Sequence, residues 1–315
     1  MAAVREAVRL HAERRSSLPE EAYLGWETST GAAARSLALP GALWGEDPAI
    51  GIKIINSSLG NVARGIPRAH GIFVLFDRET ARPIAIMEAA YISALRTAAY
   101  TALTVELLGS RTTSIAVIGC GTIGAQHIRL LAETVPEGSF LVYDSDESRS
   151  QELVTTLKHL PLRVAASARE AVEQADVVIT TTTTTTGYLR FDWLRPGALI
   201  AHVSLDDVLP EVVEQADLVI VDDWTLVASD DRRLLGRMFR SGSLAPPPEA
   251  GGPAAPGRRV DATLGGVLVG SHPGRVNDDQ IVLSNPFGMG ILDVAIAAEV
   301  WRVANRLDLG VVLPN

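Results

Sequence analysis

The sequence predicts an α/β protein in which a Rossmann-type doubly wound parallel sheet is joined to a discontinuous α+β domain. From residue 113 onward, short apolar strands alternate with helical or loop stretches, as is typical of βαβ units and a parallel sheet. A glycine-rich turn follows the first of these strands. With 315 residues the chain is long enough for two domains, and we assign residues 1–108 and 291–315 to one and 109–290 to the other.

The first domain is predicted to mix short strands and helices. Residues 1–15 have the pattern of an amphipathic surface helix, and residues 51–58 that of a strand. Residues 70–89 read as a hairpin of two alternating apolar strands around a polar turn at 77–82. Residues 92–108 form an apolar helix that leads into the second domain.

The second domain is predicted to contain five apolar strands, at 114–119, 139–144, 176–180, 198–204 and 217–223. Residues 245–257, rich in proline and glycine, are expected to form a surface loop. Residues 286–309 then form a long apolar helix. Because no strand follows it, we expect this helix to pack back on the N-terminal region, which makes the first domain discontinuous.

Composition and charge exclude several classes of function. The net charge is −9, from 28 basic and 37 acidic residues with no basic block, which argues against binding nucleic acid or an anionic membrane. The single cysteine, Cys120, excludes an intramolecular disulfide and a cysteine-cluster metal site, and it fits a reducing cytoplasm. The six scattered histidines show no metal pattern, so no metal is expected. No apolar run reaches the roughly 18 residues of a membrane span, and the N-terminus lacks the apolar segment of a signal peptide.

A dinucleotide site is predicted at the turn after the first parallel strand. Gly119, Gly121 and Gly124 form G-x-G-x-x-G between a strand and a helix, the context that this motif requires. The diphosphate is expected at the helix N-terminus, among free N–H groups, which adds Thr122 and Ile123 to the site.

The last residue of the second predicted strand favours NAD over NADP. Asp144 lies 25 residues after Gly119 and can accept hydrogen bonds from ribose hydroxyls while repelling a 2′-phosphate. The next arginine is Arg149. Farther along, the seven threonines of residues 180–186 follow another strand of this sheet. The hydroxyls of Thr181 and Thr182 contact either the cofactor or, equally well, the backbone of the turn itself.

Three cations of the first domain stand in apolar surroundings. Arg96 is the one charge in the interior of its helix, and Arg35 and Lys53 lie in strand-like stretches. A buried arginine needs an anionic partner, which is either a structural carboxylate or an acidic ligand. Arginine can grip a carboxylate with two hydrogen bonds, and lysine supplies a point charge that can also exchange a proton.

The sequence resembles the ornithine cyclodeaminase/μ-crystallin superfamily over nearly its whole length. The resemblance rests on GIKIINSS, GIPRAHG, VLFDRETARPIA, ALRTAA, VIGCGTIGAQH and the last helix. It implies a two-domain NAD(P) enzyme that acts on amino acids or imines and is usually a homodimer joined through the first domain. It also implies that Arg35, Lys53 and Arg96 hold the substrate carboxylate.

Within that superfamily, SSLGNVARGIPRAHG, VSLDD and NPFGMGILD look like the dehydrogenases of 2,3-diaminopropionate biosynthesis. Those enzymes oxidise N-(2-amino-2-carboxyethyl)-L-glutamate with NAD, releasing 2,3-diaminopropionate and 2-oxoglutarate. Ornithine cyclodeaminases carry a Gly-Gly-Asp segment where this chain has Ser204 and Leu205, and we assign Ser204 to the cofactor site. Two neighbouring residues are candidates for the catalytic aspartate of this family. The spacing to Pro210 favours Asp207, whereas alignment on the strand favours Asp206.

The same resemblance suggests further residues around the substrate. A substrate with three carboxylates needs more positive charge than ornithine does, which makes Arg64 and Arg68 additional contacts. From its closeness to Arg68 in the sequence, His70 is expected to line the pocket. Asp293, on the last helix, is expected either to orient a cation of the pocket or to act as a cap, and not to take part in the chemistry. The chain begins later than members of this branch usually do, so contacts of the first strand are expected to differ.

Two other functions stay open at this point. One is a cyclodeaminase or ketimine reductase that uses the same cations. The other is a non-catalytic binding protein like μ-crystallin, which keeps the nucleotide site to hold a small ligand. If the dehydrogenase reading holds, the product is expected to enter a siderophore or a peptide antibiotic.

Overall fold

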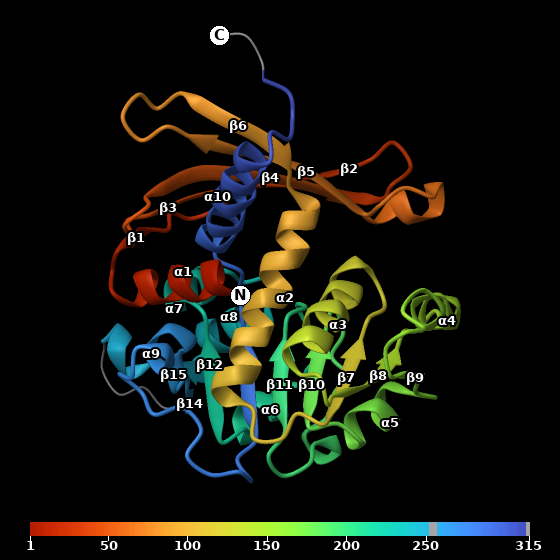
Figure 1. Cartoon of the computed structure of the whole chain (residues 1–315). Helices are drawn as coiled ribbons and strands as arrows, with labels where there is room; N and C mark the ends of the chain where they lie inside the picture. Colours follow the sequence, from red (N-terminus) through yellow and green to blue (C-terminus); the bar gives the residue numbers. More distant parts are fainter. Residues whose placement is uncertain (252–256, 313–315) are drawn as a thin grey trace. The chain divides into compact units, whose positions relative to one another are not determined.

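In a computed structural model, which describes residues 1–251 and 257–312, the chain divides into two compact units. Unit 1 comprises residues 1–96 and the described residues from 289 onward, and unit 2 comprises residues 97–288 (Figure 1). The division falls inside helix α2 (Ala90–Leu108), upstream of the boundary predicted at residue 108. No helix in the described residues combines the length and apolar character that a membrane crossing requires.

Unit 1 is built on a six-stranded antiparallel sheet with the order β1-β3-β4-β5-β6, in which β2 also pairs with β3. The strands are β1 (Ser16–Ser17), β2 (Ala22–Glu27), β3 (Ala33–Leu43), β4 (Ala49–Ser58), β5 (Ala69–Phe76) and β6 (Pro83–Glu88). The 3₁₀ helix η1 (Leu59–Arg64) lies between β4 and β5, and helix α1 (Ala2–Ala12) precedes the sheet. The predicted hairpin is β5–β6, and the predicted N-terminal helix is α1.

Helix α10 (Gly290–Arg306) covers one face of this sheet, which we call the inner face. A Cβ on Gly41 of β3 would lie 3.1 Å from Ile291, and one on Gly290 would lie 3.2 Å from Leu39. The glycines therefore let helix and sheet approach closely. Phe73, fully buried on β5, belongs to the same face because it pairs with Lys53 of β4.

Unit 2 contains an eight-stranded parallel sheet with the order β9-β8-β7-β10-β11-β16-β12-β15. The strands are β7 (Ser114–Ile118), β8 (Ser139–Tyr143), β9 (Leu162–Val164), β10 (Val177–Thr180), β11 (Leu199–His202), β12 (Leu218–Val221), β15 (Ala262–Thr263) and β16 (Val282–Asn285). The helices are α3 (Thr122–Thr134), α4 (Glu147–Thr156), α5 (Ala168–Glu173), α6 (Pro210–Gln215), α7 (Trp224–Ser229), α8 (Leu234–Arg240) and α9 (Leu264–Leu268). The predicted fold class and all five predicted strands are confirmed.

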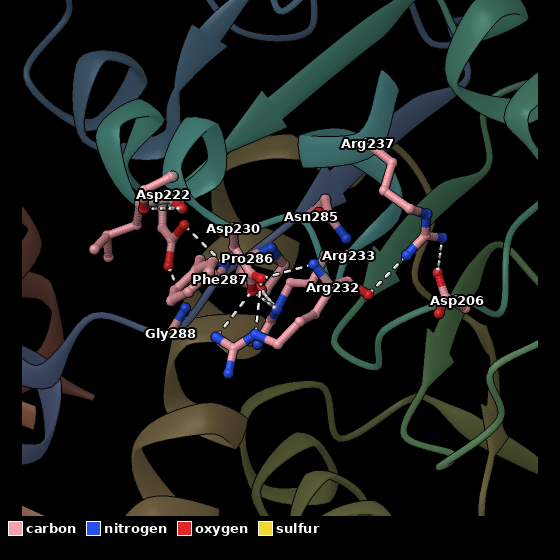
Figure 2. A network of polar contacts seen from close by, with 12 residues as sticks. Asp206, Asp222, Asp230, Arg232, Arg233, Arg237, Asn285, Pro286, Phe287 and Gly288 are labelled. Atoms are coloured by element: carbon pink, nitrogen blue, oxygen red, sulfur yellow. Dashed lines mark hydrogen bonds and ion pairs between the residues drawn. The ribbon is translucent and has the colours of Figure 1, made fainter. Parts of the chain in front are cut away.

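The end of unit 2 differs from the prediction. Residues 282–285 form a buried strand, β16, between β11 and β12, and the last helix begins only at Gly290. The segment after β16 is fixed by Asp222, whose buried carboxylate accepts hydrogen bonds from the backbone N–H groups of Phe287 (2.8 Å) and Gly288 (2.6 Å) (Figure 2). Burial raises the pKa of this carboxyl group.

The proline-rich segment is only partly the surface loop that was predicted. Ala245 is buried in β13 (Leu244–Ala245), which pairs with β14 (Arg258–Arg259), and Pro247 is buried as well. Pro248–Ala250 form a short 3₁₀ helix. The rest of the prediction falls largely on residues 252–256, which lie outside the described residues.

Candidate active site

The glycine turn after β7 has the geometry that a dinucleotide site needs. Gly119 adopts φ +101°, a left-handed conformation that favours glycine, and its N–H donates to the carbonyl of Tyr143. A Cβ on Gly124 would lie 2.1 Å from the Gly119 oxygen, so no side chain fits between turn and helix. The turn therefore fixes α3 close against the end of β7.

The N-terminus of α3 fits a diphosphate. A Cβ on Gly121 would meet nothing within 4 Å, so the turn is open on that side. Among the described residues, no side chain caps the first turn of the helix, which begins at Thr122 and includes Ile123. Its N–H groups and the positive end of the helix dipole can thus receive an anion, at the carboxyl ends of β7 and β10 where the strand order reverses.

Asp144 stands beside this turn at the end of β8. Its Oδ2 accepts a hydrogen bond from the Cys120 N–H at 2.8 Å, and its Oδ1 accepts from the Asp146 N–H at 3.0 Å. The side chain is half-buried, and each oxygen keeps a second lone pair for a ribose hydroxyl. Cys120 contributes its backbone here, while burial raises the pKa of its thiol to about 11.

Replacement of Asp144 by Asn is expected to weaken the preference for NAD. The change removes the negative charge that repels a 2′-phosphate, while one oxygen still accepts a backbone hydrogen bond. Because a hydrogen bond to a charged group contributes about 1.5–3 kcal/mol, the ratio of kcat/KM for NAD to that for NADP should fall by roughly 10- to 100-fold. Steady-state kinetics with both cofactors measures this ratio.

Asp146→Asn is the matched control. Asp146 is exposed and caps α4 through its bond with the Ser148 N–H, a role that asparagine also fills. An unchanged cofactor ratio in Asp144→Asn, or an equal change in Asp146→Asn, would contradict the assignment of Asp144.

The hydroxyl groups assigned to the cofactor donate to the protein itself. Thr181 donates to the carbonyl of Gly119 at 2.8 Å, and Thr182 donates to Oδ1 of Asp207 at 2.8 Å. Ser204 donates to the hydroxyl of the buried Thr180 at 2.7 Å. Of the two alternatives for the threonine run, these bonds favour turn chemistry: Thr181 fixes the glycine turn and Thr182 the segment after β11.

The two aspartates after β11 have different surroundings. Asp207 is fully buried, and its Oδ1 accepts hydrogen bonds from Thr182 and from the phenol of Tyr188, both at 2.8 Å. Its Oδ2 has no hydrogen-bond partner among the described residues and lies 4.0 Å from Nε2 of His202. Burial raises the pKa of Asp207, against the opposing effect of these hydroxyl groups.

Asp206 instead forms an ion pair with Arg237 of α8. Figure 2 shows the arginine reaching from its helix to the aspartate. The Arg237 side chain is 45% exposed, and its Nη1 donates to the carbonyl of Arg232 at 2.7 Å. Sequence reasoning missed Arg237, because nothing in its own helix points to a partner 31 residues away.

In unit 1, Lys53 and Arg96 share one carboxylate. Lys53 donates to Oδ2 of Asp293 at 2.7 Å, and Nε of Arg96 lies 3.3 Å from Oδ1 of the same side chain. Lys53 and Asp293 are buried, and the Arg96 side chain is 13% exposed. Burial lowers the pKa of Lys53 to about 8, and Asp293 opposes this shift.

Arg35 and Arg68 form a second group of cations in unit 1. Arg35 donates to the hydroxyl of Ser57, its partner across β3 and β4, at 3.2 Å. The pKa of Arg68 is lowered by burial and then by the nearby charge of Arg35. No carboxylate of residues 1–251 or 257–312 pairs with either guanidinium. Two such cations are suited to receive an anionic ligand.

The two other predicted substrate contacts, Arg64 and His70, are exposed. Arg64 is exposed at the end of η1. His70 is exposed on β5 and pairs with Asn56, an odd number of residues from Lys53 on β4, so it points to the opposite face of the sheet. The structure therefore does not bring His70 together with Lys53. The described residues also contain no group of three or more His, Cys, Asp or Glu side chains that fits a metal ion.

Comparisons with known proteins agree with this arrangement. The model of the ornithine cyclodeaminase/mu-crystallin family matches residues 3–306. N-((2S)-2-amino-2-carboxyethyl)-L-glutamate dehydrogenase of Staphylococcus aureus (strain NCTC 8325 / PS 47) is 33% identical over 319 residues, which cover 99% of this chain and 91% of the relative. The solved structure of CmnK is 40% identical with a TM-score of 0.91, covering 99% of this chain and 92% of that one. An archaeal alanine dehydrogenase dimer with bound NAD is 26% identical with a TM-score of 0.85, covering 99% and 93%.

Proposed function

Because this chain belongs to the ornithine cyclodeaminase/mu-crystallin family, we propose that it oxidises N-(2-amino-2-carboxyethyl)-L-glutamate and releases 2,3-diaminopropionate and 2-oxoglutarate. The broader class is an NAD-dependent amino-acid dehydrogenase, an oxidoreductase like the relatives described above. In this proposal unit 2 binds NAD and unit 1 binds the substrate. The single free cysteine fits a reducing cytoplasm, where we place the enzyme.

The buried and half-buried cations of unit 1 are the observation that carries the substrate assignment. Lys53, Arg96, Arg35 and Arg68 contribute four positive charges, against the Asp293 carboxylate that lies beside two of them and the Glu21 carboxylate that acts on Lys53. The proposed substrate bears three carboxylates. Alanine or ornithine bears one, which would leave the remaining cations without a partner.

The residues of this chain divide the chemical work. NAD, when bound, supplies the hydride acceptor for the glutamyl Cα–H bond. The cations of unit 1 hold the carboxylates and thereby fix the orientation of that bond. An aspartate after β11 takes the proton of the reacting nitrogen and later activates the water that hydrolyses the imine.

We assign the acid/base role to Asp206. Oδ1 of Asp207 already accepts hydrogen bonds from two hydroxyl groups, and the side chain is fully buried. Asp207 therefore has a structural role, in which it holds the segments of Thr182 and Tyr188 together. Asp206 stands beyond the carboxyl end of β11, where ligands of doubly wound sheets lie. Arg237 holds its carboxylate in place.

A substrate comparison tests the proposed function. The protein is incubated with NAD and, separately, with the proposed substrate, with L-ornithine and with L-alanine, while NADH absorbance and free ammonia are followed. We expect NADH only from the first, with 2,3-diaminopropionate and 2-oxoglutarate in equal amounts. Ammonia and proline from ornithine without NADH would identify a cyclodeaminase, and turnover of none of them would identify a binding protein. If the proposal holds, the diaminopropionate would serve a siderophore or a peptide antibiotic.

We also propose that the enzyme is a homodimer joined through the outer face of the unit 1 sheet, the face opposite α10. Residues that alternate with the inner-face positions include the exposed side chains of Leu24, Trp26, Ile72 and Ile86. An apolar sheet face of this kind is typical of an interface. A second copy is the occupant we propose, because the archaeal alanine dehydrogenase of the same fold is a dimer.

The double substitution Ile72→Lys and Ile86→Lys is expected to produce monomers. A buried charge without a partner costs several kcal/mol, so dimerisation should weaken by at least about 100-fold. Light scattering coupled to size exclusion measures the mass. Val276→Lys, an exposed apolar position of unit 2, is the control and should leave the mass unchanged. A wild-type monomer, or a lysine variant that stays dimeric, would contradict this interface.

A further inference from the structure

We propose that Asp293 is a positioning residue that holds Lys53 and Arg96 together as one carboxylate-binding pair and maintains the positive charge of Lys53. This inference rests on the proposed function, since the pair is taken to bind a substrate carboxylate. It assigns a role in the reaction to a side chain of α10, a helix that otherwise packs on the sheet.

The contacts of Asp293 fit this role better than a purely structural one. Each of its oxygens serves a different cation: Oδ2 accepts from Lys53 at 2.7 Å, and Oδ1 lies 3.3 Å from Nε of Arg96. Ser93 also bridges the two cations, because its hydroxyl accepts from Lys53 at 3.2 Å and from Arg96 at 3.4 Å. Both long side chains are thereby fixed before a ligand arrives.

The cluster is costly as a structural feature. A buried ion pair contributes little net stability, because removing both charges from water offsets their attraction. Here two cations are held by a single carboxylate, and Nε of Arg96 and Oδ1 of Asp293 are buried without a hydrogen bond of good geometry. The cluster keeps a net positive charge that a substrate carboxylate can neutralise.

Asp293 also acts on the protonation of Lys53, because its charge opposes the effect of burial. The charged groups that act on Lys53 are Asp293 from α10, Arg96 from α2 and Glu21 before β2. Burial and Arg96 lower the pKa of Lys53, whereas Asp293 and Glu21 raise it. Without the Asp293 charge, Lys53 should lose its proton at a lower pH and then no longer attract a carboxylate.

The test compares the pH dependence of kcat and KM in the wild type and in Asp293→Asn. For the wild type we expect kcat/KM to fall as pH rises through about 8, where Lys53 deprotonates. In Asp293→Asn the alkaline limb of this profile, the fall of kcat/KM with rising pH, should lie about one to three pH units lower, which is the usual effect of removing a nearby opposite charge. At pH 7, KM should rise by about twofold if the pKa of Lys53 falls by one unit and by roughly 100-fold if it falls by three, and it should recover in acid, while kcat at saturation changes little.

Four further variants separate a positioning role from a structural one. Asp293→Glu, which keeps the charge, should restore part of the alkaline limb. If Asp293 acts through the lysine, the double variant Lys53→Met with Asp293→Asn should have the same kcat/KM as Lys53→Met alone. Glu299→Gln, an exposed acid on the same helix, is the matched control and should behave as wild type. NADH binding and thermal unfolding check that each variant is folded.

A fall in kcat at every pH with constant KM, and no recovery in acid, would overturn the proposal. The binding of 2-oxoglutarate, measured by calorimetry over the same pH range, keeps this test separate from the proposed function. If the wild type binds this dicarboxylate but does not oxidise the proposed substrate, the function fails, and the shift in Asp293→Asn still decides the role of Asp293. If the wild type does not bind it at any pH, the proposal is overturned.

Discussion

Asp206→Asn is expected to lower kcat by about 100- to 10,000-fold, the range that a general acid or base contributes. Asparagine has the same shape and can still accept a hydrogen bond from Arg237, so the local structure should persist. It cannot take a proton from the reacting nitrogen or activate water. Steady-state kinetics with the proposed substrate measures the loss, and NADH binding should remain that of the wild type.

Asp207→Asn is the matched control for this prediction, because the two aspartates are adjacent. An asparagine oxygen can still accept from Thr182 and Tyr188, so we expect a change in thermal stability and a fall in kcat of less than about tenfold. The opposite ranking, with Asp207→Asn nearly inactive and Asp206→Asn active, would move the acid/base role to Asp207 and contradict our assignment.

Replacement of Arg35 and Arg68 together by Met is expected to lower kcat/KM for the proposed substrate by about 100- to 10,000-fold. Each guanidinium is taken to bind a carboxylate, and a hydrogen bond to a charged group contributes about 1.5–3 kcal/mol. Most of the loss should appear in KM, because the two arginines hold substrate carboxylates and do not exchange protons. Methionine keeps much of the apolar stem of arginine, which limits the effect on packing.

The control is Arg78→Met, which changes an exposed arginine of the β5–β6 turn that pairs weakly with Glu79. Its kinetics should match the wild type. If the double variant retained the wild-type KM, Arg35 and Arg68 would not bind the substrate, and the case for a substrate with three carboxylates would fail.

Local chemistry explains what the sequence could predict. The glycine turn could be recognised because the strand, the turn and the helix are contiguous, and each glycine has its own steric reason. The five strands found in advance are apolar and buried on both faces, as parallel strands are. The hairpin of β5 and β6 has an alternating pattern and a polar turn, which needs no information from elsewhere in the chain.

Elements whose pattern is weak were missed. Strand β16 has four residues and ends in Ser284 and Asn285, whose burial depends on its place between β11 and β12. Strand β2 is exposed along its whole length, so it has no buried stripe that would indicate a strand. The helix predicted from residue 286 begins four residues later, because the segment before it turns to present its N–H groups to Asp222.

The partners of the charged residues could not be predicted. Lys53 and Asp293 are 240 residues apart in sequence, and only the packing of α10 on the sheet brings them together. The sequence suggested that Asp293 orients a cation but not which one. The face on which His70 lies could not be predicted for a related reason: a strand residue can be assigned to a face only when its register with the neighbouring strand is known.

The most direct test of the account is to follow the hydrogen that is removed. The protein is supplied with NAD and with N-(2-amino-2-carboxyethyl)-L-glutamate that carries deuterium on the glutamyl Cα, and the products are analysed by mass spectrometry. We expect deuterated NADH together with unlabelled 2,3-diaminopropionate and 2-oxoglutarate. Unlabelled NADH, or release of the deuterium to water, would show that oxidation occurs elsewhere in the molecule and would contradict the proposed reaction.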